Sequence, residues 1–463
     1  MDYFAVGGRP FLSRFPPHIP GIFNPGRLIE QQQQQEHLQQ QALLREEGAQ
    51  DTPAPSGPSW DARGRPEVGV ARDAYAYGAP AVDTGQGTGG YAGHASLAMP
   101  TAASPLGHLL PQPEASLVND IDEDIPEAVP EATGVQIKAP KALHTGFDPN
   151  EVGKWDPCRF EMIRKVQDAT RNRGQVHLMR DTNDDMPVAV KQMPNRWVRN
   201  CHSEFVIEHP AETEMPWQDV GCVRFLNRSD YEYACNLMGV FRDDLHTYVV
   251  TSFASEGDMF SWCEAGVPPG RERELVVQPL ARQIMQAVQQ LHDYSIVHRD
   301  LSLENILLSK MDDDSLRIRV IDFSMASTSR SFRNCVRGKA SYQAPELHAD
   351  GEYDAYLSDA FSLGVTLYAV LLKDYPWLST RPGGCKCFEY VKKRGFRSYL
   401  AKRKLRNSQS RVSEFMSEPL VQLLEGLLAL DPAERLTLGE AAWAGHGRRS
   451  VWDEPWMQTG PGD

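Results

Sequence analysis

Hydrophobic and polar positions follow two different periods after residue 159. Apolar side chains alternate with polar ones in short runs rich in β-branched residues, which we predict as strands. Longer segments carry apolar side chains at helical spacing and predict helices. The predicted strands are 160–166, 175–179, 188–192 and 247–251, and the predicted helices are 217–226, 275–294 and 354–372.

The order of these elements predicts the fold class. Strands come first and long helices come later, which is typical of an α+β protein in which the sheet and the helices are segregated. We therefore expect a small β-sheet lobe followed by a larger helical lobe. The longest uninterrupted apolar stretch, 363–372, is about half of what a membrane-spanning helix needs, so we expect no membrane association.

The first 157 residues differ in composition from the rest of the chain. They contain 19 of the 33 prolines and 18 of the 36 glycines, and eight of the eleven residues at 31–41 are glutamine. Such a segment buries too little apolar surface to offset the entropy lost on ordering. We predict a mostly disordered tail at 1–157, with a Gln-rich helix at 27–47 as the alternative for that part, a folded domain at 158–447 and a short C-terminal tail at 448–463.

Charge and cysteine usage narrow the classes of partner and compartment. The chain has 48 Lys and Arg against 62 Asp and Glu, and the net charge of −14 argues against nucleic acid as a partner. The eight cysteines show no disulfide framework spacing, and the first residues lack the basic start and apolar run of a secretion signal, so we expect no signal peptide. We therefore expect a cytoplasmic or nuclear protein.

Four polar residues interrupt segments that would otherwise be apolar strands or tight loops. Lys191 ends Val-Ala-Val-Lys, Asp300 and Asn305 lie in His-Arg-Asp-Leu-Ser-Leu-Glu-Asn, and Asp322 lies in Val-Ile-Asp-Phe. Further motifs follow in the order Ala344-Pro345-Glu346, Ser358 to Gly364, and Asp431 to Arg435. In this order and spacing the motifs resemble the signature set of the eukaryotic protein kinase superfamily over residues 158–447.

The resemblance implies a bilobal kinase fold that transfers the γ-phosphoryl group of ATP, with Mg²⁺, to serine and threonine hydroxyls of proteins. Such a transfer needs positive charge and oxygen ligands around the moving phosphoryl group. Lys191 would reach the phosphates, Asn305 and Asp322 would bind Mg²⁺, and Asp300 would accept the proton of the attacking hydroxyl. The nucleotide-facing positions implied by the resemblance are Gly174, Val176, Ala189, Thr251 as the gatekeeper, Asp258 and Leu307.

The chain departs from the family pattern in the glycine-rich loop and the metal loop. Ala169 and Arg171 occupy the first two glycine positions, and only Gly174 remains. Ser324 replaces the glycine of the metal loop, where positive φ is often needed. Two acids are candidates for pairing with Lys191: helical spacing favours Asp219, and Glu214 is the alternative.

The residue types at two neighbouring positions of the active site are exchanged. The activation segment of the family corresponds here to residues 322–346. The family usually has lysine two residues after the catalytic aspartate and threonine in the activation segment, whereas this chain has Ser302 and Lys339. We hypothesise that Lys339 replaces the missing lysine and serves as a catalytic residue at the γ-phosphate. The alternative is that Lys339 is a solvated loop charge.

Regulation and substrate choice also follow from the resemblance. Arg299, beside the catalytic aspartate, predicts a phosphate on the activation segment and an upstream kinase as a candidate partner. The predicted phosphate acceptors are Ser327, Thr328, Ser329 and Ser331. Glu304 and Asp258 predict basic residues near the substrate hydroxyl.

A pseudokinase scaffold with little catalysis is the alternative function, favoured by the altered glycine positions.

Overall fold

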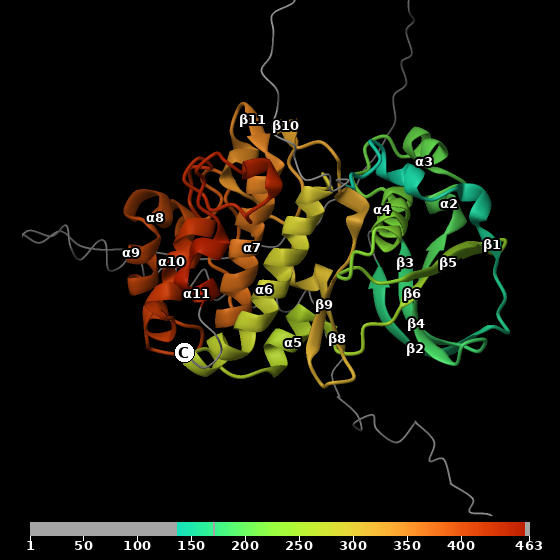
Figure 1. Cartoon of the computed structure of the whole chain (residues 1–463), viewed down its shortest axis with the longest axis horizontal. Coiled ribbons are helices and arrows are strands. Elements are labelled where there is room, and N and C mark those ends of the chain that lie inside the picture. The colour runs from blue at the N-terminus through green and yellow to red at the C-terminus, as the bar shows by residue number, and fades with distance from the viewer. Residues whose placement is uncertain (1–136, 170–171, 459–463) are drawn as a thin grey trace, which may run out of the picture. The chain divides into compact units, whose positions relative to one another are not determined.

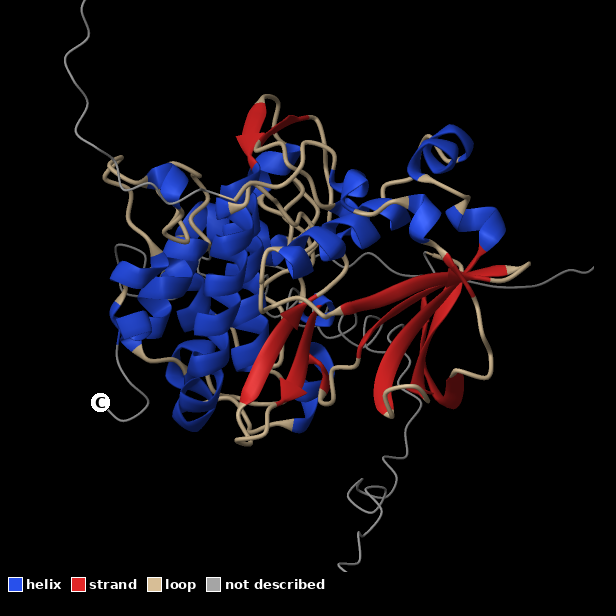
Figure 2. Ribbon diagram, turned by 45° about the vertical axis from the view of Figure 1, so that its right-hand side comes forward, coloured by secondary structure: helices blue, strands red, loops and turns tan. Residues whose placement is uncertain are grey.

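A computed structural model describes residues 137–169 and 172–458. Strands gather in one lobe and most helices in the other, which confirms the α+β fold class (Figure 2). Most of the predicted tail, including the alternative helix at 27–47, lies outside the described residues, as do Arg171 and the last five residues.

The N-terminal lobe is a six-stranded sheet in the order β1-β5-β6-β4-β3-β2 (Figure 1). All neighbouring strands are antiparallel except β1 and β5. Val188 and Val190 on β4 face the core, so the alternate residues Ala189 and Lys191 project to the other face of the pleat. The strands are β1 (Gly153–Lys154), β2 (Phe160–Ala169), β3 (Gly174–Asp181), β4 (Met186–Pro194), β5 (Leu237–Arg242) and β6 (His246–Ser252).

Three helices follow β4 before the sheet resumes. The last of them begins at Pro216, because proline in the first turn needs no backbone hydrogen bond and has a preset φ. Trp217 and Val220 on this helix are buried against the sheet side of the lobe. The helices are α2 (Asn195–Val198), α3 (His202–Glu208) and α4 (Pro216–Arg228).

The C-terminal lobe is built on two long helices that pack against each other, α6 and α7. Its helices are α5 (Met259–Ala265), α6 (Arg271–Asp293), α7 (Ala355–Leu372), α8 (Lys386–Arg394), α9 (Phe396–Lys402), α10 (Glu418–Leu427) and α11 (Pro455–Gln458). Its strands are β7 (Gly257–Asp258), β8 (Ile306–Lys310), β9 (Leu316–Val320), β10 (Ser331–Arg333) and β11 (Glu352–Asp354), of which β7, β8 and β9 form one small sheet and β10 and β11 another.

Helix α7 is long and apolar enough to cross a membrane. It is the only helix of this kind within the described part of the chain. All 18 of its residues are buried inside the protein. A helix that is apolar on every side and buried on every side is the centre of a core. Its position between α6 and α10 explains the long apolar run in the sequence.

Packed structure extends past both predicted domain boundaries. On the N-terminal side, Leu143 and Phe147 are buried, and Gly153 pairs with Phe241 in the sheet. On the C-terminal side, Val451 and the short helix α11 pack against the helical lobe. Composition missed these flanks because a few apolar residues within a Pro- and Gly-rich segment are enough to dock on an existing core.

Candidate active site

Lys191 on β4 forms an ion pair with Asp219 on α4. The Lys191 Nζ lies 3.5 Å from Asp219 Oδ2, and the two side chains are 21% and 16% exposed. Burial lowers the pKa of Lys191, but the carboxylates of Asp219, Asp322 and Glu214 outweigh burial and raise it. Lys191 is therefore held as a cation at the junction of the lobes.

The structure distinguishes the two acids proposed for Lys191. Because α4 begins at Pro216, Asp219 lies in its first turn and faces Lys191. Glu214 lies before the helix, is buried, and raises the pKa of Lys191 through its charge. The second carboxylate oxygen of Asp219 accepts a 2.9 Å hydrogen bond from the backbone N–H of Phe323. Asp219 thus joins the strand lysine to the loop that carries Asp322.

Asp322 itself adopts a left-handed backbone conformation with φ of 64°. The Ser324 hydroxyl donates a 2.6 Å hydrogen bond to Asp322 Oδ1. Burial raises the pKa of Asp322, but Lys191 and the Ser324 hydrogen bond outweigh burial and lower it. Serine at position 324 does not strain the backbone, because the positive φ of this loop falls on Asp322. The Ser324 hydroxyl also helps to keep the Asp322 carboxylate ionised.

Asp300 and Asn305 belong to one tight loop between α6 and β8. The Asn305 amide donates to the backbone oxygen of Asp300 at 2.7 Å and to its Oδ2 at 3.3 Å. The backbone oxygen of Asn305 accepts from the N–H of Ile321 at 3.0 Å, one residue before Asp322. His298 and Phe323 pack together with ring centroids 5.2 Å apart and are fully buried. These bonds bring the predicted proton acceptor and both predicted metal ligands into one site.

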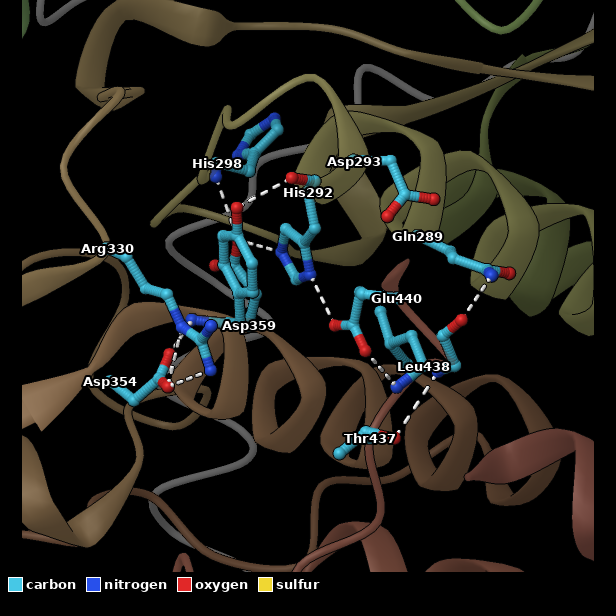
Figure 3. Close-up of polar contacts among 12 residues, drawn as sticks. Gln289, His292, Asp293, His298, Arg330, Asp354, Asp359, Thr437, Leu438 and Glu440 are labelled. Atoms are coloured by element: carbon cyan, nitrogen blue, oxygen red, sulfur yellow. Dashed lines mark hydrogen bonds and ion pairs between the residues drawn. The ribbon is translucent and has the colours of Figure 1, made fainter. Parts of the chain in front are cut away.

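A buried ionic network supports the loop that carries Asp300 and Asn305 (Figure 3). Asp359 on α7 accepts hydrogen bonds from the backbone N–H groups of His298 and Arg299 at 2.8 and 2.9 Å. His292 lies 3.1 Å from Asp359 Oδ2 and 2.7 Å from Glu440 Oε1. Burial lowers the pKa of His292, but the two carboxylates outweigh burial and raise it to about 9. His292 is thus a buried cation between two buried anions.

The exchanged residues Ser302 and Lys339 touch each other. The Lys339 ammonium donates to the Ser302 hydroxyl at 2.5 Å and forms a 3.1 Å ion pair with Glu304. Gly338, with φ of 82°, approaches the catalytic loop so closely that a side chain there would meet the backbone oxygen of Arg299. The activation segment therefore delivers Lys339 to the loop of Asp300, and Lys339 is not a free loop charge.

The carboxylates predicted to select basic substrates already have internal partners. Glu304 pairs with Lys339, and Asp258 accepts from the backbone N–H of Ser261 at 2.7 Å as the N-cap of α5. The predicted preference for basic residues near the acceptor hydroxyl stays a prediction.

Arg299 contacts the activation segment through residues other than the predicted phosphate acceptors. Its guanidinium lies 4.0 Å from the centre of the Phe332 ring and 3.0 Å from Cys335 Sγ. All four hydroxyls bond elsewhere: Ser327 accepts from the backbone N–H of Ser329, Thr328 donates to the backbone of Lys141, Ser329 donates to the backbone of Ser331, and Ser331 bonds Glu352. Phosphorylation of this segment stays a prediction.

The predicted nucleotide-facing residues lie on neighbouring strands. Val176 pairs with Lys191, Ala189 pairs with Thr251, and Asp258 pairs with Leu307. The structure therefore brings these side chains around one end of the sheet and the adjoining β7 and β8. Gly174 serves the sheet itself, because a side chain there would meet the backbone of Gln192.

Arg173, directly before Gly174, is engaged by an aromatic side chain. It has φ of 53°, and its guanidinium lies 5.4 Å from the centre of the Trp197 ring. At this distance the guanidinium makes a cation–π contact with the indole.

The Ala-Pro-Glu motif is anchored by the late arginine. Arg435 is fully buried and binds both carboxylate oxygens of Glu346, at 2.5 and 2.9 Å. This bidentate pair joins the end of the activation segment to the segment after α10.

Sequence reasoning missed two residues that support the site, His292 and Glu440. The available signals were a histidine at the polar end of an apolar helix and a glutamate five residues after Arg435. Neither position marks a network by itself, because the partner of each lies on a distant segment.

The donor set at the junction suits Mg²⁺. One carboxylate, from Asp322, and one amide oxygen, from Asn305, are hard oxygen ligands, and Mg²⁺ characteristically adds waters and substrate phosphates to so few protein ligands. Within the described residues, no group of three His, Cys, Asp or Glu side chains forms a dedicated metal cage. The residues present therefore fit a cation that arrives with a phosphate ligand.

Comparison with known proteins agrees with this geometry. A family profile described as "Protein kinase domain" matches residues 172–446. The chain is 32% identical over 291 residues to serine/threonine-protein kinase SAPK5 of Oryza sativa subsp. japonica, which covers 61% of this chain and 68% of that protein. It is 27% identical over 254 residues to serine/threonine-protein kinase SIK2 of Gallus gallus and 28% identical over 253 residues to SIK1 of Mus musculus. Each SIK match covers 54% of this chain, but only 27% of SIK2 and 28% of SIK1.

Proposed function

Because this chain belongs to the protein kinase family, we propose that it is a catalytically active kinase that uses ATP and Mg²⁺ to phosphorylate serine and threonine hydroxyls of proteins. One arrangement supports the proposal: Lys191, Asp322, Asn305 and Asp300 meet at the junction of the lobes, where hydrogen bonds and charge contacts join them. A scaffold has no need to keep all four groups.

Each residue has a separate part in the proposed reaction. Asp300 accepts the proton of the attacking hydroxyl and orients the oxygen in line with the phosphoryl group. Lys191, kept charged by Asp219, neutralises phosphate charge. Lys339, delivered by the activation segment, adds a second positive charge beside Asp300.

Asn305 and Asp322 would hold Mg²⁺. The chemistry that the ion would supply there is positive charge against the phosphates. The contribution of the protein is to keep Asp322 ionised and aimed, through the Ser324 hydroxyl and the neighbouring Lys191.

The test is phosphate incorporation by the full-length chain with Mg²⁺ and ATP, read by mass spectrometry beside Asp300→Asn. We expect wild type to gain phosphate on serine or threonine and the variant to gain none. A panel of serine, threonine and tyrosine peptides then reads the acceptor class.

The scaffold alternative predicts a different result. If wild type gains no phosphate and modifies no peptide, even after incubation with an activating kinase, the catalytic proposal is wrong. Phosphate on wild type and on Asp300→Asn alike would point to a contaminating kinase.

A further inference from the structure

A segment in front of the family-matched region packs along α4. We define the strap as residues 139–155, all of which precede the kinase-matched residues 172–446. It contains the short 3-10 helices η2 (Leu143–Gly146) and η3 (Pro149–Glu151) and ends in β1. In Figure 1 the strap is the teal segment beside α4. The contacts of the strap reach both lobes, and α4 is the helix that carries Asp219.

The backbones of the strap and α4 approach each other at two glycines, Gly146 in η2 and Gly221 in α4. A Cβ on Gly146 would lie under 3.0 Å from the backbone oxygen of Gly221, and a Cβ on Gly221 would lie under 3.0 Å from the backbone of Leu143 and His144. Neither glycine has a positive φ. Glycine is unfavourable inside a helix, so the close approach of the strap is the physical reason for glycine at position 221.

Side chains extend this contact along α4. Phe147 is buried in one cluster with Trp217 and Val220. Glu151 forms a 3.0 Å ion pair with Arg224. These groups lie within one to two helical turns of Asp219, so a shift of the strap changes the surface against which that part of α4 rests.

The other contacts of the strap tie it to the helical lobe. The backbone N–H of Ala139 donates to the oxygen of Tyr294 at the end of α6, at 2.9 Å. The backbone oxygen of Lys141 accepts from the Thr328 hydroxyl in the activation segment at 2.7 Å. The N-terminus of α4 also bonds the metal loop, because Met215 N–H donates to the oxygen of Ser324 at 3.1 Å. Helix α4 is therefore held between the strap and the loop of Asp322.

We propose that the strap is a positioning element for the transfer reaction, and that Gly146 and Gly221 are positioning residues that keep Asp219 against Lys191. Aspartate is one methylene shorter than glutamate, so the Asp219–Lys191 pair requires α4 to stay close to β4. The strap supplies that restraint from outside the matched domain. The expected change in kcat rests on the proposed kinase activity. The expected restraint of α4 by the strap rests on packing alone.

The test uses the full-length chain with Gly221→Ala and, separately, Gly146→Ala. Arg228→Ala is the matched control, because Arg228 is an exposed residue of the same helix away from the strap. Hydrogen–deuterium exchange by mass spectrometry reads residues 139–147 and 216–228. Steady-state kinetics with MgATP and a degenerate serine/threonine peptide library read kcat and KM.

Alanine has the higher helix propensity, so Gly221→Ala would slow exchange in α4 if nothing packed against it. We expect the opposite, which is faster exchange in both segments, together with a kcat lower by about tenfold or more at similar peptide KM, because small misplacements of catalytic groups are costly. Arg228→Ala should match wild type in both readouts. Circular dichroism and thermal melting identify a variant that fails to fold. If one glycine variant fails to fold, the test uses the other.

Two results would overturn the proposal. One is unchanged exchange in both segments for both glycine variants, which would mean that the strap does not brace α4. The other is faster exchange with unchanged kcat, which would mean that the strap packs without positioning Asp219. If wild type transfers no phosphate, the proposed function fails on its own, and the exchange measurement still decides whether the strap braces α4.

Discussion

The two halves of the active site are held in different ways. On the C-terminal side, the loop of Asp300 rests on a buried network in which Asp359 accepts two backbone hydrogen bonds and an ion pair from His292. On the N-terminal side, Lys191 forms an ion pair with one partly exposed acid, Asp219, at 3.5 Å, and Asp322 and Glu214 add only the effect of their charges. The first half is restrained by many buried bonds and the second by the placement of one helix.

The difference indicates where this kinase is easiest to perturb. Removing one group from the buried network leaves other charges without partners in a site with little water, which is costly in folding free energy. Moving α4 breaks a weaker contact and changes the rate of transfer more than the stability of the fold. The four predictions below test this contrast, from the largest expected effect to the smallest.

The largest effect is expected for Asp359→Asn in the buried network. The amide cannot accept from both backbone N–H groups and also pair with His292, so a buried cation loses one of its two partners. We expect unfolding free energy to fall by about 3–5 kcal/mol, measured by urea denaturation.

The matched control for this change is Asp354→Asn. Asp354 pairs with Arg330 in the same region, but its side chain is 23% exposed. We expect a loss of about 1 kcal/mol or less there. Equal losses in the two variants would contradict the importance of the buried network.

The second prediction concerns pH. The folded pKa of His292, about 9, lies above its ordinary value of 6.5, so the stabilisation from the charged imidazole is complete below pH 6.5. It is lost as pH rises from 6.5 through about 9. We expect wild type to lose about 2–3 kcal/mol of stability relative to His292→Gln over this range.

The measurement is urea unfolding of both proteins between pH 6 and pH 9.5. His446→Gln, at an exposed histidine, should keep the slope of wild type. An unchanged slope in His292→Gln would show that His292 is not the titrating group.

The third prediction addresses the weaker half of the site. Asp219→Asn removes the negative charge that holds Lys191 and keeps similar size, so we expect kcat to fall by about tenfold to a hundredfold with unfolding free energy nearly unchanged. Asp219→Glu should recover only part of the activity, because the strap limits how far α4 can move away. Full recovery by glutamate would mean that the helix adjusts freely.

The smallest effect is expected at the exchanged pair. Lys339→Ala should lower kcat by about tenfold or less, since it removes one of several positive charges near the transferred group. The double exchange Ser302→Lys with Lys339→Thr restores the usual family arrangement and should recover activity. Wild-type turnover in Lys339→Ala, with normal substrate binding, would rule out a catalytic part for this lysine.

Several parts of the fold were predictable because their signals are local. The strands at 188–192 and 247–251 and the helices at 217–226 and 354–372 match β4, β6, α4 and α7 closely. Alternation and helical spacing within each segment report directly which face is buried.

Other features depended on contacts between distant segments. The strap was predicted as disordered because its composition resembles the tail, yet Phe147 and Leu143 are buried. The sequence also did not reveal that Arg299, predicted to pair with a phosphate, contacts Phe332 and Cys335. In both cases the deciding contact joins residues that no local window contains together.

By itself, the sequence determined which chemical groups the site holds and in what order, because residue type and motif spacing are written along the chain. It identified the family resemblance, the α+β class, and Lys191, Asp300, Asn305 and Asp322 as the groups to consider. It also located the exchange of Ser302 and Lys339.

Only the tertiary structure decided how those groups are paired and held. It paired Lys191 with Asp219 rather than Glu214, joined Lys339 to Ser302, and set the strap against α4. Ion pairs and hydrogen bonds require separations of a few ångströms between atoms that lie tens of residues apart in the chain, and packing of the whole fold sets those separations.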